Sequence, residues 1–208
     1  MKNLIPTIIH RPERTDRQKF IDDIKDYFIR IKILDAITAK NANMPNENCN
    51  FGAGCSASHL MAVEKSNTDK PLLVLEDDAV IDKQKYKQFL SLGNPPEDCG
   101  IILLGGGDHP WGSAIGWELP ERTQSWTQVD KPFFGSHAVI YMPIIHKTKF
   151  LQNAWRNLFF FPKEGPDSWM TENVLKLTIE SVNLKIYRPI VLPFTFGESI
   201  SDRNNKKI

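Results

Sequence analysis

Residues 71–82 read PLLVLEDDAVID, an apolar run that ends in three consecutive carboxylates, Glu76, Asp77 and Asp78. A short continuous apolar run after a turn-forming proline is typical of a strand buried on both faces of a parallel sheet. Carboxylates this close together repel and raise each other's pKa unless a positive charge neutralises them. A hard divalent cation with a bound phosphate is one such neutraliser, because Mg²⁺ and Mn²⁺ take carboxylate and phosphate oxygens. In open α/β sheets, ligands bind beyond the carboxyl ends of the strands. The alternative is a solvated acidic turn after an edge strand.

The segments before and after this strand predict further strands and helices in alternation. Apolar and β-branched runs predict strands at residues 4–10, 29–37, 99–104, 135–142 and 184–191. Apolar residues at helical spacing predict helices at residues 16–28, 56–65, 82–92, 145–160 and 168–182. Asp82 and Asp167 stand where N-caps belong, and Pro189 places the last strand at a sheet edge or a strand end. The opening strand–helix–strand order indicates a doubly wound α/β domain.

The length and composition favour a single soluble globular domain. The chain has 208 residues and a formal net charge of +1, which gives no global attraction to nucleic acid or to an anionic membrane. No stretch approaches the length of a transmembrane helix. The three cysteines are odd in number and lack C-x-x-C spacing, so we expect a reducing compartment and a cytoplasmic protein. We expect the domain to span residues 1–200 and a polar tail to span 201–208.

Two further segments offer ligand-binding groups next to strand ends. Arg11, Arg14 and Arg17 follow the first predicted strand, and guanidinium groups bind phosphate or carboxylate in a fork. The alternative is that these arginines pair with acidic residues of the following helix. Glycines and serines within residues 52–58 suit a helix start, where free backbone N–H groups attract anions, and His59 follows them. A histidine with a purely structural role is the alternative there.

Residues 110–132 show little periodicity and contain Trp111, Trp117 and Trp126. Exposed aromatic rings on loops are platforms for the apolar faces of sugars. The alternative is a β-hairpin packed on the core with its tryptophans buried, which we favour for at least one of the three.

In this order of motifs the sequence resembles glycosyltransferase family 25, the lipopolysaccharide and procollagen galactosyltransferases. The matching pieces are the arginine-rich segment HRPER, the second-strand element ILDAI, the signature GCSASH, the acidic EDDA and the later GSHAVIY, at residues 10–14, 33–37, 54–59, 76–79 and 135–141. Together they span most of the chain. The signature followed by the acidic motif carries most of the specificity.

The sequence departs from the family pattern in two places. The second-strand element has Asp35 before Ala36 rather than after it, and the sequence diverges beyond Gly105, which leaves the acceptor open. The chain is also short for the family. A single catalytic domain of a larger, virus-encoded protein is one origin consistent with that length.

The resemblance implies a GT-A fold, which is a Rossmann-like α/β fold with a mostly parallel central sheet and helices on both faces. It also implies a nucleotide-sugar donor, most often a UDP-sugar, and Mn²⁺ or Mg²⁺. We expect Asp78 to bind the metal directly and Glu76 to bind it directly or through water, or to hold the ribose. Asp77 is then expected to face the donor sugar. The candidates for the donor site are Ile9, His10, Arg11, Arg14, Asp35, Ser58 and His59.

The stereochemistry of transfer stays open. An inverting reaction needs a general base beside the acceptor hydroxyl. The resemblance favours Asp167, with Glu172 and Asp108 as fallbacks. A retaining reaction needs no such base, and Asp167 would then bind the acceptor. We expect residues 110–132 to form the acceptor cleft.

The sequence therefore predicts a metal-dependent glycosyltransferase that moves a hexose or deoxyhexose from a UDP-sugar to a hydroxyl of a glycan acceptor. The alternatives are a non-catalytic carbohydrate-binding domain and a metal-dependent phosphohydrolase or nucleotidyltransferase. A phosphohydrolase or nucleotidyltransferase usually needs a second acidic pair or a lysine-bearing glycine loop near the first strand, and neither is evident in the sequence. A carbohydrate-binding domain would leave the acidic strand end unexplained.

Overall fold

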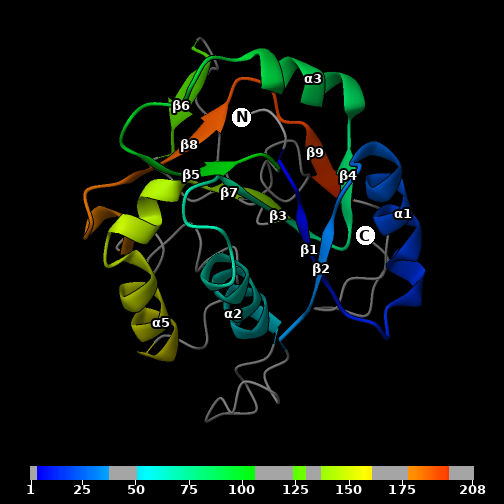
Figure 1. Ribbon diagram of the computed structural model, residues 1–208, viewed down its shortest axis with the longest axis horizontal. Coiled ribbons are helices and arrows are strands. Elements are labelled where there is room, and N and C mark those ends of the chain that lie inside the picture. Colours follow the sequence, from blue (N-terminus) through cyan, green and yellow to red (C-terminus); the bar gives the residue numbers. More distant parts are fainter. Residues whose placement is uncertain (1–3, 38–50, 106–123, 130–136, 161–177, 197–208) are drawn as a thin grey trace, which may run out of the picture.

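The computed structural model describes residues 4–37, 51–105, 124–129, 137–160 and 178–196, and its elements form an α/β sandwich (Figure 1). Its strands are β1 (Thr7–His10), β2 (Lys32–Asp35), β3 (Leu72–Glu76), β4 (Ala79–Ile81), β5 (Cys99–Leu103), β6 (Trp126–Gln128), β7 (Ala138–Tyr141), β8 (Lys185–Pro189) and β9 (Phe194–Phe196). Its helices are the 3₁₀ helices η1 (Thr15–Arg17) and η2 (Pro143–Lys147) and the α-helices α1 (Gln18–Tyr27), α2 (Phe51–Glu64), α3 (Lys83–Ser91) and α5 (Phe150–Phe160).

The main sheet has the strand order β2-β1-β3-β7-β5-β8-β6, and β4 pairs with β9 in a small second sheet. Strand β1 is parallel to β2 and β3, and β5 is parallel to β8. Strand β7 runs antiparallel to both β3 and β5, so β5 has the same direction as β3. Among the strands in the described residues of this sheet, only β7 and the edge strand β6 oppose the common direction of β1, β2, β3, β5 and β8. The mostly parallel sheet predicted from the sequence is therefore confirmed.

Each face of the sheet carries its own hydrophobic core. Successive side chains of β3 alternate between the two cores, as a strand's period of two residues requires: Leu72 and Val74 face one core, and Leu73 and Leu75 face the other. Helices α2 and α5 cover the first face and α1 and α3 the second (Figure 1). Both faces of the central strands are thus buried, which accounts for their continuous apolar runs.

The predicted elements agree with the structure in their order, with local differences. Asp82 is the N-cap of α3, where its carboxylate accepts hydrogen bonds from two backbone N–H groups at 3.0 and 2.9 Å. The predicted helix over 145–160 is divided into η2 and α5. Helix α2 begins at Phe51, so the glycines of this segment lie inside the helix rather than before it. Pro189 is the last residue of β8, which is one of the two places predicted for it.

The aromatic side chain of Trp126 packs on the core rather than standing free in a loop. Trp126 begins the edge strand β6, is half-buried, and meets the ring of Phe89 edge to face with 6.3 Å between centroids. Trp111 and Trp117 lie outside the described residues, as does most of the helix predicted at 168–182.

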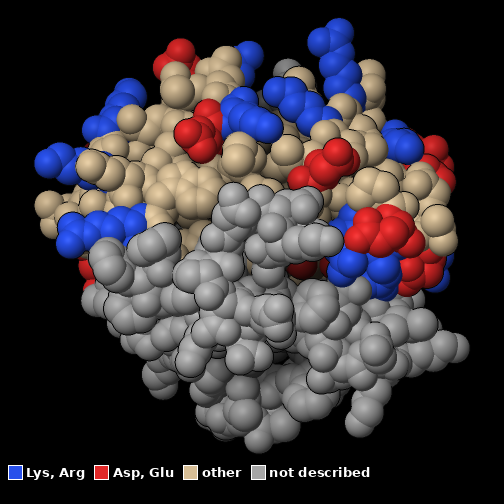
Figure 2. Space-filling view, turned by 90° about the horizontal axis from the view of Figure 1, so that it is seen from below, with Lys and Arg blue, Asp and Glu red and all other residues tan. Residues whose placement is uncertain are grey.

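Within the described part of the chain, none of the helices is both long enough and apolar enough to cross a membrane. Basic and acidic side chains are interspersed over the described part of the face in Figure 2. That distribution agrees with the near-zero net charge.

Candidate active site at the carboxyl edge of the sheet

The predicted binding residues converge because three neighbouring strands end at one edge. Asp35 at the end of β2 lies opposite His10 at the end of β1, and Ile9 lies opposite Glu76 at the end of β3. The antiparallel β7 brings its own start to this edge, and the Glu76 N–H donates to the His137 carbonyl at 2.9 Å. Acidic groups, imidazoles and nearby arginines are therefore collected where ligands bind in open α/β sheets.

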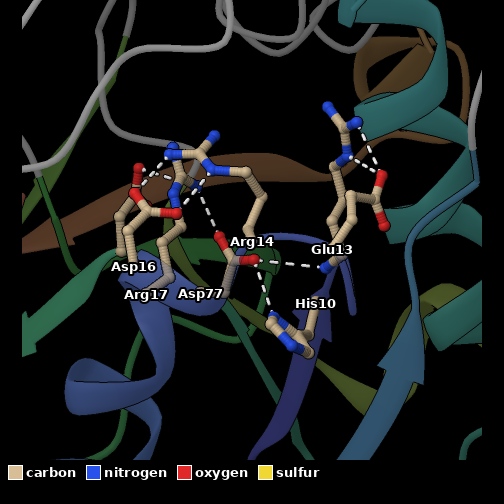
Figure 3. Close-up of polar contacts among 8 residues, drawn as sticks. His10, Glu13, Arg14, Asp16, Arg17 and Asp77 are labelled. Carbon is tan, nitrogen blue, oxygen red and sulfur yellow. Dashed lines mark hydrogen bonds and ion pairs between the residues drawn. The ribbon is translucent and has the colours of Figure 1, made fainter.

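Asp77 is the centre of a buried polar cluster (Figure 3). Its side chain is 5% exposed and forms an ion pair with Arg17, whose side chain is 8% exposed. Its second oxygen is hydrogen-bonded to His10 Nδ1 at 2.9 Å and accepts from the Arg11 backbone N–H at 3.2 Å. Both carboxylate oxygens are therefore engaged by the protein itself. In this structure Asp77 ties the end of β3 to the end of β1 and to the start of the first helix.

The carboxylate of Asp78 has fewer contacts with the protein than that of Asp77. One of its oxygens lies 3.2 Å from Arg17 Nη1. The other, Oδ1, is buried and has no hydrogen-bond partner among the described residues. Burial, followed by the neighbouring charge of Glu76, raises the pKa of Asp78 to about 7 against the opposing effect of Arg17. A buried carboxylate oxygen that lacks a donor is a suitable ligand for a cation.

Glu76 points away from this cluster toward helix α2. Its Oε1 accepts a hydrogen bond from the Cys55 thiol at 3.3 Å and lies 3.6 Å from His59 Nε2. His59 is 1% exposed, and its Nδ1 is hydrogen-bonded to the hydroxyl of Tyr141 at 3.1 Å. The sequence placed His59 near the donor, and the structure places it directly behind the first carboxylate of the acidic motif.

The arginines divide between two roles. Arg11 and Arg14 form forked pairs with acids two residues ahead, Glu13 at 2.6 Å and Asp16 at 2.8 Å (Figure 3). Hydrogen bonding from Arg14, against the opposing effect of burial, lowers the pKa of Asp16 to about 2. Both pairs are local. The Arg14–Asp16 pair is one that the alternative interpretation of the sequence expected, whereas the partner of Arg11 is Glu13, which precedes the helix. Arg17 instead points inward and forms ion pairs with Asp77 and Asp78 of the acidic motif. Of the three arginines, it is therefore the one that contacts the candidate site.

The other predicted donor residues have mixed surroundings. Ile9 belongs to the hydrophobic core, and Asp35 is exposed at the strand end. Ser58 is fully buried, and its hydroxyl donates to the Gly54 carbonyl and accepts from the Ile37 N–H, both at 2.7 Å. Ser58 thus joins α2 to the chain after β2. The candidate bases Asp167, Glu172 and Asp108 lie outside the described residues.

Sequence reasoning named Arg17 among three arginines of a possible anion site but did not connect it with the acidic motif, although a signal for that was present. Arg17 precedes Phe20, Ile21 and Ile24 at helical spacing, and these three residues are buried. A cation on the same stripe must be buried too, and it then needs a buried acidic partner. The contact of Tyr141 with His59 could not be read from the sequence, because it depends on the antiparallel insertion of β7.

Two solved structures show the same fold across nearly all of this chain. A glycosyltransferase involved in the glycosylation of the major capsid of PBCV-1 is 10% identical, has a TM-score of 0.54, and matches over 97% of this chain and 96% of its own. A mutant of Drosophila β-1,4-galactosyltransferase 7, in complex with manganese, UDP-Gal and xylobiose, is 10% identical and has a TM-score of 0.50. That match covers 97% of this chain and 73% of the galactosyltransferase. No family model matches the sequence, and no curated protein matches it.

The sheet order, the helices on both faces and these two structures establish the GT-A fold, the Rossmann-like fold of nucleotide-sugar transferases. The predicted fold class is confirmed. The narrower resemblance to glycosyltransferase family 25 stays a prediction.

Proposed function

We propose that this chain is a metal-dependent glycosyltransferase that moves a hexose or deoxyhexose from a UDP-sugar to a hydroxyl of a glycan acceptor. The observation that carries the proposal is the acidic strand end, where Asp78 presents a buried carboxylate oxygen without a donor among the described residues. The GT-A fold supports it, because this fold carries its donor site at the same sheet edge.

The residues at this edge fit a hard divalent cation. Asp78 would hold Mn²⁺ or Mg²⁺ directly, and Glu76 would hold it directly or through water. The ion would act as a Lewis acid that neutralises the charge of the departing nucleoside diphosphate. Its positive charge would also favour the ionised form of Asp78, whose pKa is otherwise raised to about 7.

Arg17 orients the carboxylates for this role. Its guanidinium holds Asp77 and one oxygen of Asp78, so the other oxygen of Asp78 keeps a fixed direction. Asp77 then acts mainly through position, because its own oxygens are engaged by Arg17 and His10. Asp77 would contact the donor sugar once donor binding loosens these bonds.

Arg11 and Arg14 are suited to receive the diphosphate. The side chains of Arg11 and Glu13 are 29% and 56% exposed, and those of Arg14 and Asp16 are 13% and 43% exposed. Exposed ion pairs contribute at most about 1 kcal/mol, so a diphosphate can replace Glu13 at small cost. Replacing Asp16 beside the more buried Arg14 costs more. Asp35, at the end of the neighbouring strand, would hold the ribose.

The acceptor side is proposed from the sequence. Asp167 would take the proton of the acceptor hydroxyl in an inverting reaction, and Glu172 and Asp108 are the fallbacks. His59 and Ser58 would support the donor site from behind, since both are buried beneath it.

The test is thermal unfolding of the chain against a panel of nucleotide-sugars and nucleoside diphosphates, with Mn²⁺ or with EDTA. A ligand at about 100 times its Kd adds about 2.7 kcal/mol. For a chain of this size that is a shift of several degrees, at roughly 2–4 °C per kcal/mol. The shift should require both metal and a UDP-sugar, and Asp78→Asn should abolish it.

Asp98→Asn is the matched control. Asp98 precedes β5 at the opposite edge of the sheet, where it pairs with Lys185 at 3.0 Å. This variant should keep the ligand-induced shift. The best donor is then tested for turnover as UDP released in the presence of glycan acceptors. The proposal is wrong if no nucleotide shifts the unfolding temperature with metal present, and a shift with glycans alone would favour the carbohydrate-binding alternative.

A further inference from the structure

We propose that Cys55, His59 and Glu76 form a second metal site, which takes a borderline-soft ion of the Zn²⁺ class. The three side chains come from α2 and from the end of β3, and their ligand atoms all lie within 4.8 Å of one another. This site shares Glu76 with the proposed Mn²⁺ or Mg²⁺ site at Asp78 but takes its other two ligands from α2, and it does not rest on the proposed transferase activity.

The helix supplies two of the ligands in a fixed arrangement. Cys55 and His59 are four residues apart on α2, so their side chains project from the same face. Glu76 approaches that face from the strand beneath. Its Oε1 is 3.3 Å from Cys55 Sγ and 3.6 Å from His59 Nε2.

These two separations are close to those between the ligands of a tetrahedral ion, and all three ligand atoms lie within 4.8 Å of one another. With Zn–S near 2.3 Å and Zn–N and Zn–O near 2.0 Å, tetrahedral angles place a sulfur and an oxygen about 3.5 Å apart and a nitrogen and an oxygen about 3.3 Å apart. The observed separations are 3.3 Å from sulfur to oxygen and 3.6 Å from nitrogen to oxygen. Three protein ligands would leave the fourth position open for water or for a ligand atom.

The hydrogen bonding of His59 favours a metal-binding role over a purely structural one. Its ring is 1% exposed, and its Nε2 has no hydrogen-bond partner among the described residues. Its other nitrogen is held by the Tyr141 hydroxyl at 3.1 Å. An N–H at Nδ1 that donates to this hydroxyl leaves the lone pair of Nε2 facing the carboxylate and the thiol. An oriented imidazole with an outer hydrogen bond is the usual arrangement of a metal-binding histidine.

The ligand types separate this site from the one at Asp78. Thiolate and imidazole favour Zn²⁺ and similar ions, whereas Mn²⁺ and Mg²⁺ favour all-oxygen sites. Glu76 is common to both sites, but Cys55 and His59 belong to one and Asp78 to the other. Single substitutions therefore distinguish them.

The experiment is a titration of the metal-free, reduced chain with Zn²⁺ and, separately, with Co²⁺. Wild type should bind one equivalent of Zn²⁺ with protection of one thiol from a thiol reagent. Co²⁺ should give a thiolate-to-metal charge-transfer band and the visible spectrum of a tetrahedral ion. Both readouts are independent of transferase activity.

The variants assign the ligands. Cys55→Ser should remove the charge-transfer band, and Tyr141→Phe, which preserves the ring, should weaken Zn²⁺ binding about 10–100-fold. Cys99→Ser is the matched control, because burial raises the pKa of the Cys99 thiol to about 12 and keeps it from acting as a ligand. Asp78→Asn should leave Zn²⁺ binding unchanged.

Two results would overturn the proposal. One is failure of the folded wild-type chain to bind Zn²⁺ or to give the Co²⁺–thiolate band. The other is a band that survives Cys55→Ser. The wild-type spectrum decides the matter even where a variant does not fold. If wild type binds Zn²⁺ at this site but binds no UDP-sugar, the proposed transferase function is wrong and the proposed zinc site is still supported.

Discussion

Replacing Arg17 by methionine should destabilise the chain more than any substitution of an exposed cation. Arg17 is 7% exposed and forms ion pairs with both Asp77 and Asp78. Methionine keeps much of the side-chain volume but leaves two buried carboxylates beside Glu76 without that cation. Removing one partner of a buried ion pair costs about 3–5 kcal/mol. At roughly 2–4 °C per kcal/mol, the midpoint should fall by about 6–20 °C.

The assay is thermal and urea unfolding followed by circular dichroism at pH 8 in EDTA. Lys25→Met is the control, because the pair of Lys25 with Asp22 is exposed and screened by water, so its loss should leave the unfolding midpoint nearly unchanged. The loss in Arg17→Met should shrink at pH 5, since the freed carboxylates can then take up protons. Adding Asp77→Asn to Arg17→Met should recover part of the stability, which a double-mutant cycle measures.

Unfolding of Arg17→Met within about 1 kcal/mol of wild type at pH 8 would contradict this prediction. So would a larger loss of stability in the Arg17→Met, Asp77→Asn double variant than in Arg17→Met alone. Either result would mean that the cluster is hydrated and that Arg17 does not compensate a buried charge.

Three further predictions concern single positions. In metal-free buffer, the raised pKa of Asp78 means that the folded state holds its proton more tightly than the unfolded state. The free energy of unfolding of wild type should therefore fall relative to that of Asp78→Asn as the pH rises from about 4 to about 7, and the difference should stay constant above about pH 7. Urea titrations at a series of pH values measure this difference. Gly105→Ala should cost about 1–3 kcal/mol in the same assay, because the added Cβ would meet the buried His137 ring at 2.1 Å; Gly93→Ala, whose Cβ meets nothing within 4 Å, should change little. Asp82→Ala should cost about 1 kcal/mol through loss of the α3 N-cap, and Asp82→Asn should recover most of it.

The elements that sequence reasoning recovered are those with a strong local signal. The apolar run 72–75, the buried stripe of α1 and the cap at Asp82 each determine their structure within a few residues. The fold class follows from their alternation. The edge at which Glu76 and His10 both lie follows as well, because parallel strands end together.

The features that were missed depend on pairing between distant segments. Strand β4 is only three residues long and forms because β9, far along the chain, lies beside it. The contact between His59 and Tyr141 exists only because β7 is inserted between β3 and β5. Neither the register nor the neighbours of a strand can be read from its own residues, so the surroundings of the candidate site could not be predicted at this level.

The antiparallel position of β7 also has a consequence for how the chain is made. Strands β1, β2 and β3 can pair as soon as the ribosome has released them. Strand β5, all of whose residues are buried in the final sheet, pairs only with β7 and β8, which are synthesised after it. Until β7 and β8 have been synthesised, the backbone N–H and C=O groups on both edges of this apolar segment have no partner strand. Exposed strand edges of this kind are prone to aggregation. A nascent chain that stalls before β7 should therefore depend on chaperones, whereas one that stalls after β8 should not.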